Sequence, residues 1–169
     1  LYIEKLSTPR LKRRVNNSVS PTASFKLLDL LIYLSPLFNG RVHTVSAAGL
    51  LNADYRVPSL DYSDLLQLCH VLTQNMEEVY ALFRQMVFNI EVGNRDDHAK
   101  NFSFQLLNGK WKLSSAYDIL PSEGFNGFHT TTINNNGEPT KEDIWAVATK
   151  VGISKAKANE IIEEVKAVN

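Results

Sequence analysis

A long apolar stripe and the polar stretch that follows it dominate the pattern of the chain. Apolar residues between positions 76 and 92 recur at intervals of three and four, which is the spacing of one face of an α-helix. Gly93 follows and is typical of a helix that ends in the left-handed conformation. The next eight residues, 94–101, read Asn-Arg-Asp-Asp-His-Ala-Lys-Asn and are almost entirely polar. This polar stretch is the first candidate for a functional site.

A β-hairpin is predicted directly after the polar stretch. Residues 102–106 alternate apolar and polar side chains, Asn-Gly at 108–109 is a hairpin turn signal, and residues 111–113 alternate again. The second strand would return the chain toward the point where the first one began. Asp118 follows this strand, so we expect it at the same end of the hairpin as the polar stretch.

The other periodic segments predict a mainly helical domain. Asp61 is a candidate N-cap for a helix that runs to about residue 74. Thr140 and Ser154 are candidate N-caps for two helices near the C-terminus, the first with an acidic residue in the capping-box position. Residues 121–139 are rich in Gly and Asn, and we expect a long loop there with one short strand at 130–133.

The N-terminal part of the chain has a different character. We interpret residues 1–38 as a basic arm with one short helix, because four of the five residues 10–14 are Lys or Arg. A solvated arm is the favoured interpretation, since the aromatic residues that usually accompany a nucleic-acid-binding patch are missing. A patch for nucleic acid or an acidic partner is the alternative. Residues 39–169 are long enough to form a second unit with its own core.

Composition narrows the class of protein. Of the 169 residues 44% are hydrophobic and 21% are charged, and the formal net charge is zero. Neither nucleic acid nor a membrane surface is therefore favoured as a direct partner. No apolar run is long enough to predict a membrane span, and no secretory signal is evident. Cys69 is the only cysteine, which excludes an intrachain disulfide and favours a reducing cytoplasm. Its helical context predicts a small, buried apolar side chain.

The polar stretch contains the residue types that phosphoryl transfer needs. That reaction uses a carboxylate to accept the proton of the attacking hydroxyl, oxygen ligands for Mg²⁺, and cations near the phosphates. The spacing from Asp96 to Asn101 is that of the catalytic loop of protein kinases, where the Asp is the base and the Asn binds metal. Asp118, on the loop after the hairpin, would then be the second metal-binding carboxylate.

The motifs resemble a known family. The segment NRDDHAKNFSF, followed by WKLSSAYDILPS, is similar to the C-terminal lobe of HipA-like kinases, which are bacterial serine/threonine kinases of toxin–antitoxin systems. The similarity extends over roughly residues 40–165. It implies a mainly α fold with a small β-hairpin, the architecture of a protein-kinase-like C-terminal lobe. It also implies ATP and Mg²⁺ as cofactors, and a DNA-binding antitoxin and a protein substrate as partners.

The resemblance assigns roles to individual residues. Asp96 matches the catalytic Asp, Asn101 a Mg²⁺ ligand, and Asp118 the second metal-binding Asp. His98 lies two residues after the catalytic position, where eukaryotic-type kinases often carry a phosphate-contacting Lys, so we expect it to have a supporting role. We expect Lys100 to support the site through contacts that stabilise the loop.

The resemblance also leaves parts unmatched. The N-terminal lobe of the family, with its phosphate-covering loop and nucleotide-anchoring Lys, has no counterpart in residues 1–38. Both lobes must hold ATP, so we expect this chain alone to be weakly active or inactive, with an N-lobe in cis or in trans. One alternative is a catalytically inactive, truncated or split lobe that acts as a toxin–antitoxin interaction module.

A second alternative concerns the same cluster of residues. A metal-dependent phosphodiesterase would use Asp96, Asp97, His98 and Asp118, whose side chains suit divalent metals. In the kinase interpretation, by contrast, Asp97 stabilises the loop and takes no part in the chemistry. The two hypotheses therefore differ in what they require of Asp97.

Overall fold

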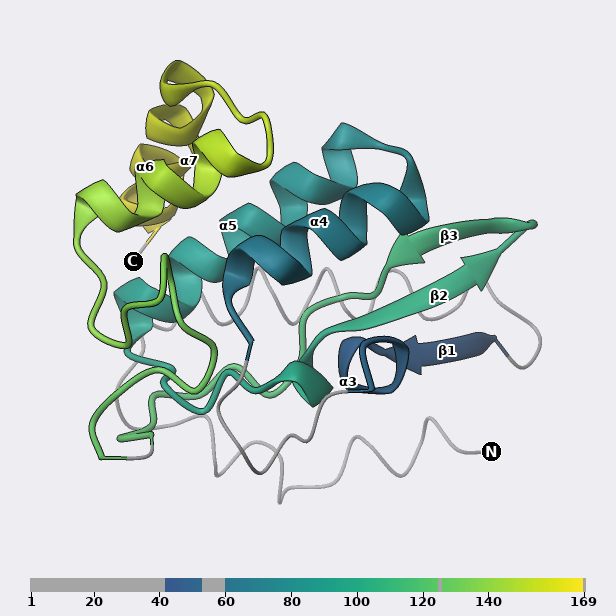
Figure 1. Cartoon of the computed structure of the whole chain (residues 1–169), viewed down its shortest axis with the longest axis horizontal. Helices are drawn as coiled ribbons and strands as arrows, with labels where there is room; N and C mark the ends of the chain where they lie inside the picture. Colours follow the sequence, from purple (N-terminus) through teal and green to yellow (C-terminus); the bar gives the residue numbers. More distant parts are fainter. Residues whose placement is uncertain (1–41, 53–59, 125, 169) are drawn as a thin grey trace. The chain divides into compact units, whose positions relative to one another are not determined.

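The computed structural model describes residues 42–52, 60–124 and 126–168 (Figure 1). Nearly all of them belong to one compact unit, Gly40–Ala167. The basic arm and short helix predicted within residues 1–38 lie outside the described residues. No described helix combines the length and the apolar character that crossing a bilayer requires.

Two helices packed against each other form the centre of the unit (Figure 1). Helix α4 spans Tyr62–Thr73 and helix α5 spans Met76–Val92. The Asp61 side chain accepts a hydrogen bond from a first-turn amide, and the Asp64 side chain accepts one from the Asp61 amide, which confirms the predicted N-cap. Helix α5 ends at Gly93, whose φ of +69° confirms the predicted left-handed C-cap. The polar stretch therefore begins at a rigid helix end.

A three-stranded antiparallel sheet lies beside these helices in the order β1-β2-β3 (Figure 1). Strand β1 is His43–Ser46, β2 is Ser103–Leu107 and β3 is Lys110–Leu113. The predicted hairpin is confirmed. Its turn residues Asn108 and Gly109 have φ values of +52° and +75°, as a type I′ turn requires. Strand β1 was not predicted, because its four residues lack an apolar alternation.

Four further elements complete the described chain. Helix α3 is Ala47–Leu50, the 3-10 helix η3 is Ala99–Asn101, helix α6 is Lys141–Lys150 and helix α7 is Lys155–Val168. The capping box predicted at the start of α6 is present. Ser154 Oγ accepts a hydrogen bond of 3.2 Å from a first-turn amide of α7, which confirms the second predicted cap. The described fold is thus mainly α, as predicted, and the hairpin is part of a larger sheet.

The short strand predicted at residues 130–133 is not formed. The segment makes only single bridges, from Thr132 to Asp61 and from Ile133 to Asn136. The physical reason is that its amides do not share one neighbouring strand. Thr130 N and Thr131 N donate to one side-chain carboxylate, and the main-chain acceptors of the segment, such as the carbonyls of Arg95 and Leu60, belong to separate parts of the chain. The long loop predicted for residues 121–139 is confirmed for the described residues of that range.

The core lies where α4 and α5 meet the sheet and the C-terminal helices. Its largest fully buried side chains include Tyr62, Phe83, Phe102 and Phe104. Cys69 belongs to the same core, and its burial raises the pKa of the thiol to about 12. The prediction of a small, buried side chain at this position is confirmed. This core holds the ends of α4, α5 and β2, from which the site is built.

Candidate active site

One carboxylate of the polar stretch is completely buried. Asp97 has an exposed fraction of 0% and accepts four hydrogen bonds. Its Oδ2 accepts from Tyr62 Oη at 2.9 Å and lies 2.8 Å from His129 Nδ1. Its Oδ1 accepts from the amides of Thr130 and Thr131 at 3.0 and 3.2 Å. The carboxylate is surrounded by fixed donors, which confirms that Asp97 stabilises the loop.

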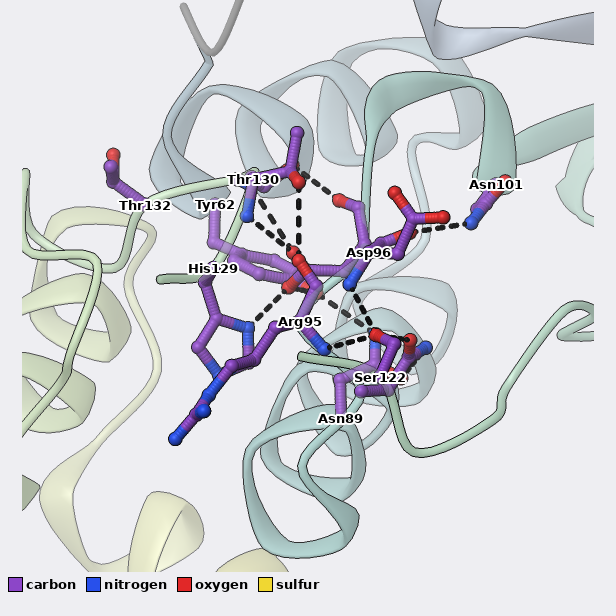
Figure 2. A network of polar contacts seen from close by, with 12 residues as sticks. Tyr62, Asn89, Arg95, Asp96, Asn101, Ser122, His129, Thr130 and Thr132 are labelled. Carbon is purple, nitrogen blue, oxygen red and sulfur yellow. Dashed lines mark hydrogen bonds and ion pairs between the residues drawn. The ribbon is translucent and has the colours of Figure 1, made fainter. Parts of the chain in front are cut away.

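These donors connect the polar stretch to both central helices (Figure 2). Tyr62 belongs to α4, and its hydroxyl also accepts a hydrogen bond of 2.9 Å from Asn89 Nδ2 of α5. Burial raises the pKa of Tyr62 well above its usual value, and the nearby Asp97 carboxylate raises it further. The phenol therefore stays protonated and donates to Asp97. Two rigid helices thereby fix the position of one loop residue.

The neighbouring carboxylate, Asp96, is in the opposite environment. The residue is exposed, and within the described part of the chain its hydrogen bonds all involve its main chain. Its amide donates to Ser122 Oγ at 2.8 Å and its carbonyl accepts from Asn101 Nδ2 at 3.0 Å. Figure 2 shows the side chain on the side of the loop where Asn101 lies, away from His129. Asp96 thus combines a fixed backbone with a carboxylate that a hydroxyl can reach.

Asn101 is held at the end of η3 with only 6% of its surface exposed. Its amide nitrogen Nδ2 donates to the carbonyl of Asp96, and its main-chain N donates to the carbonyl of His98 at 2.8 Å. Since Nδ2 must be the atom that faces the Asp96 carbonyl, the orientation of the side-chain amide is determined. The remaining atom, Oδ1, is a hard oxygen of the kind that Mg²⁺ accepts as a ligand.

Asp118 lies against the same stretch, as the hairpin predicted. Its carbonyl accepts from Asn94 Nδ2 at 3.4 Å. The preceding residue, Tyr117, bonds to Ser103 Oγ at 2.7 Å and donates to the carbonyl of Lys100. Asp118 itself has a φ of +57°, a left-handed conformation that is uncommon for residues other than glycine. Such residues gather at ligand sites, where the surrounding structure must hold them in place.

The comparison with known proteins identifies the family. The family described as HipA-like C-terminal domain matches residues 11–169. This chain belongs to that family. A solved structure with the same fold is HipA of Shewanella oneidensis MR-1, described in a toxin–antitoxin complex with HipB and its operator DNA. The two chains are 16% identical and superpose with a TM-score of 0.62 over 75% of this chain. No curated protein matches the chain.

The match covers 35% of the Shewanella HipA chain, so this HipA-like domain corresponds to only part of that protein. At this identity, the likeness concerns the fold alone. The match over residues 11–169 confirms the expected family, and the roles of individual residues still depend on the geometry of the site.

The described residues contain no group of three or more His, Cys, Asp or Glu arranged to hold a metal ion. A kinase-type Mg²⁺ needs only one or two protein ligands, because phosphates and water supply the others. Asn101 and Asp118 carry side-chain oxygens of the kind that this smaller requirement calls for. The phosphodiesterase hypothesis does not fit, because Asp97 is buried and its oxygens are already occupied by donors.

The two supporting residues remain predictions. His98 is half-buried and its carbonyl helps to close η3, while Lys100 is exposed and its carbonyl accepts from Tyr117. These main-chain contacts assign no chemical role to either side chain.

Sequence reasoning missed most of the residues that hold this loop. Tyr62, Asn89 and Ser122 lie within the family-like range 40–165, but nothing in the sequence pairs any of them with the polar stretch. His129 lay in a family-like segment but had no predicted partner. The structure joins it to Asp97 across 32 positions of sequence.

Proposed function

We propose that this HipA-like domain is the catalytic-loop and metal-binding lobe of a toxin serine/threonine kinase, which transfers the γ-phosphoryl group of ATP to a protein hydroxyl. The contrast between two adjacent carboxylates carries the proposal. Asp97 is buried and surrounded by donors, whereas Asp96 is exposed and its main chain is held at both sides. Membership of the family and the spacing to Asn101 support the same interpretation.

Each residue has a distinct task in this proposal. The Asp96 carboxylate orients the substrate hydroxyl and accepts its proton. Because hydrogen bonds hold the Asp96 amide and carbonyl, little reorganisation is needed when the hydroxyl arrives. Asn101 and Asp118 supply oxygen ligands to Mg²⁺. When bound with ATP, Mg²⁺ neutralises charge on the phosphates. His98 and Lys100 support the loop and the phosphates from the same stretch.

The proposal includes partners that the domain needs. ATP must be held between two lobes, so an N-terminal lobe acts with this domain in cis or in trans. The Shewanella HipA is described in complex with HipB and operator DNA. By analogy, we propose a DNA-binding antitoxin as a partner, together with a protein substrate. The cytoplasm is the proposed compartment, because the single cysteine is a buried thiol.

Phosphotransfer from radiolabelled ATP by the full-length protein tests the assignment of the base. We expect Asp96→Ala to reduce the rate by about 10²- to 10⁴-fold, the usual contribution of a general base. Asp118→Ala should remove activity that added Mg²⁺ does not restore. Glu138→Ala removes an exposed carboxylate and is the matched control that should retain activity. Among the described residues, Glu138 forms its hydrogen bond through its main chain.

The outcomes separate the proposed function from its alternative. If Asp96→Ala retained the wild-type rate, the assignment of the base would be wrong. If the full-length wild-type protein bound its antitoxin but transferred no phosphate under any Mg²⁺ concentration, even with an N-terminal lobe supplied in trans, the inactive interaction module would be the better description.

A further inference from the structure

The segment that carries Asp118 is attached to the polar stretch at a second point. Four residues after Asp118, the hydroxyl of Ser122 accepts hydrogen bonds from two successive amides, those of Arg95 at 3.0 Å and Asp96 at 2.8 Å. The Ser122 amide donates to the carbonyl of Gly93 at 3.0 Å. Ser122 therefore holds the main chain at two places. It binds Arg95 and Asp96 at the proposed base, and it binds Gly93 directly after α5.

Asn94 joins this attachment to Asp118. The residue is 3% exposed, and its Nδ2 donates to Asn89 Oδ1 at 3.1 Å and to the carbonyl of Asp118 at 3.4 Å. Its Oδ1 accepts from Ser122 Oγ at 3.4 Å. Because Ser122 Oγ already accepts from two amides, its own hydrogen is directed to Asn94. Donors and acceptors in this unit therefore have a single consistent arrangement.

These bonds link the main chains of Asp96 and Asp118 through only two side chains. The link runs from the Asp96 amide to Ser122 Oγ, then to Asn94, and then to the Asp118 carbonyl. The covalent route between the same residues passes through η3 and the whole hairpin. Tyr117 attaches the same segment to Ser103 and Lys100. The short route adds a direct link between the main chains of Asp96 and Asp118, and it helps to determine how far apart the two residues lie.

We propose that Asn94 and Ser122 form a brace that positions Asp118 relative to Asp96, so that both carboxylates meet one Mg²⁺–nucleotide. The inference deepens the proposed kinase function and rests on it. Catalytic groups must be held within about 0.5 Å of their working geometry, and irregular loops do not provide this alone. Asp118 needs such support in particular, because its backbone has a left-handed conformation. Asn94 and Ser122 are positioning residues, since they act through the backbone of the two acids.

Three variants separate the brace from general stability. Ser122→Ala removes the oxygen that both loop amides share, whereas Ser122→Thr keeps a hydroxyl. Asn94→Asp preserves the shape but places an acceptor against Asn89 Oδ1 and the Asp118 carbonyl. Ser115→Ala is the matched control, because this serine is exposed and lies on the same connection between β3 and Asp118.

The full-length protein is used for three measurements. Phosphotransfer is followed as a function of Mg²⁺ concentration. Binding of Mn²⁺ in the presence of a non-hydrolysable ATP analogue is followed by electron paramagnetic resonance. Amide hydrogen exchange is measured at Arg95 and Asp96. Loss of residues that orient metal ligands usually weakens metal binding by about 10- to 100-fold, and we expect a shift of this size in the half-saturating Mg²⁺ concentration for Ser122→Ala.

The expected result has three parts. In Ser122→Ala the two amides exchange faster, and both Mg²⁺ dependence and Mn²⁺ affinity weaken by the stated factor. Asn94→Asp weakens metal binding with less effect on those amides. Ser122→Thr and Ser115→Ala stay within about 3-fold of wild type, well below the range expected for a lost positioning residue.

Two results would overturn the inference, and they differ from each other. If Ser122→Ala speeds amide exchange and lowers only the maximal rate, with an unchanged Mg²⁺ half-saturation and Mn²⁺ affinity, the brace does not position the metal ligands. If the wild-type protein neither transfers phosphate nor binds Mn²⁺, the proposed function itself fails, and the metal-positioning role falls with it.

Discussion

Truncation of Asp97 provides the most direct test of how the loop is held. Asp97→Ala leaves three donors without an acceptor, namely Tyr62 Oη, His129 Nδ1 and the amide of Thr131. The Thr130 amide keeps a second acceptor, the carbonyl of Arg95. An unsatisfied buried donor costs about 1–3 kcal/mol, so a simple sum would reach about 3–9 kcal/mol. Water can enter the vacated space and His129 can change tautomer, which lowers this total.

The loss of one partner from a buried charged contact costs about 3–5 kcal/mol in other proteins. We therefore expect Asp97→Ala to lower the free energy of unfolding by about 4 kcal/mol, near the middle of that range. Domains of this kind are stable by only about 5–15 kcal/mol, so the loss is a large fraction of the total. The variant should be folded in water but unfold at a much lower denaturant concentration.

Asp97→Asn refines the same argument. Its side-chain oxygen can accept from the amides of Thr130 and Thr131, while its NH₂ group faces Tyr62 and His129. The tyrosine oxygen can accept a hydrogen bond, and the imidazole can carry its hydrogen on the other nitrogen. Only one or two weaker bonds are then lost, so we expect a cost of about 1–2 kcal/mol.

Guanidinium unfolding of the full chain, followed by tryptophan fluorescence and far-ultraviolet circular dichroism, measures these differences. Asp96→Ala is the control, because it removes the adjacent exposed carboxylate and should change the free energy of unfolding by no more than about 0.5 kcal/mol. Two observations would refute the reasoning: a cost below about 1 kcal/mol for Asp97→Ala, the least expected for one orphaned donor, or an equal cost for Asp96→Ala.

Two further predictions concern the long loop and its response to acid. Gly124→Ala should destabilise the fold by at least about 2 kcal/mol more than Gly127→Ala in thermal unfolding, within the range known for overpacked sites. Both glycines have positive φ, at +63° and +80°, so the backbone strain of an alanine is shared. Only at Gly124 would the added Cβ collide, because it would lie 2.4 Å from the carbonyl oxygen of Phe128. Equal losses of stability in the two variants would contradict this reasoning. Hydrogen bonds, first that from the Asn134 side chain, hold the pKa of Asp143 well below its usual value. The unfolded chain therefore takes up a proton first, and the stability that Asp143 contributes is present above pH of about 4 and lost as the pH falls further. Asp143→Asn should flatten this acid dependence of the unfolding midpoint, and an unchanged slope below pH of about 4 would argue against the assignment.

The helix ends and the hairpin were predictable because their causes are local. An N-cap such as Asp61, the left-handed Gly93 and the Asn108–Gly109 turn each act on residues within four positions in the sequence. Strand β1 was missed because its pairing with β2 depends on residues 57 to 63 positions away rather than on its own pattern (His43 pairs with Leu106, for example). The strand predicted at 130–133 failed for the same kind of reason, since a distant carboxylate accepts hydrogen bonds from two of its amides.

The sequence by itself determined the family, the main helices, the hairpin and the spacing between Asp96 and Asn101, because each depends on neighbouring residues or on a short motif. Only the tertiary structure decided which of two adjacent aspartates, Asp96 and Asp97, is exposed and which is buried. Tyr62 and His129 lie 35 and 32 positions from Asp97, and the fold brings both to it. Burial among those donors makes Asp97 part of the framework. Because consecutive residues of an extended loop point to different sides, Asp96 faces solvent, as its proposed role as the base requires.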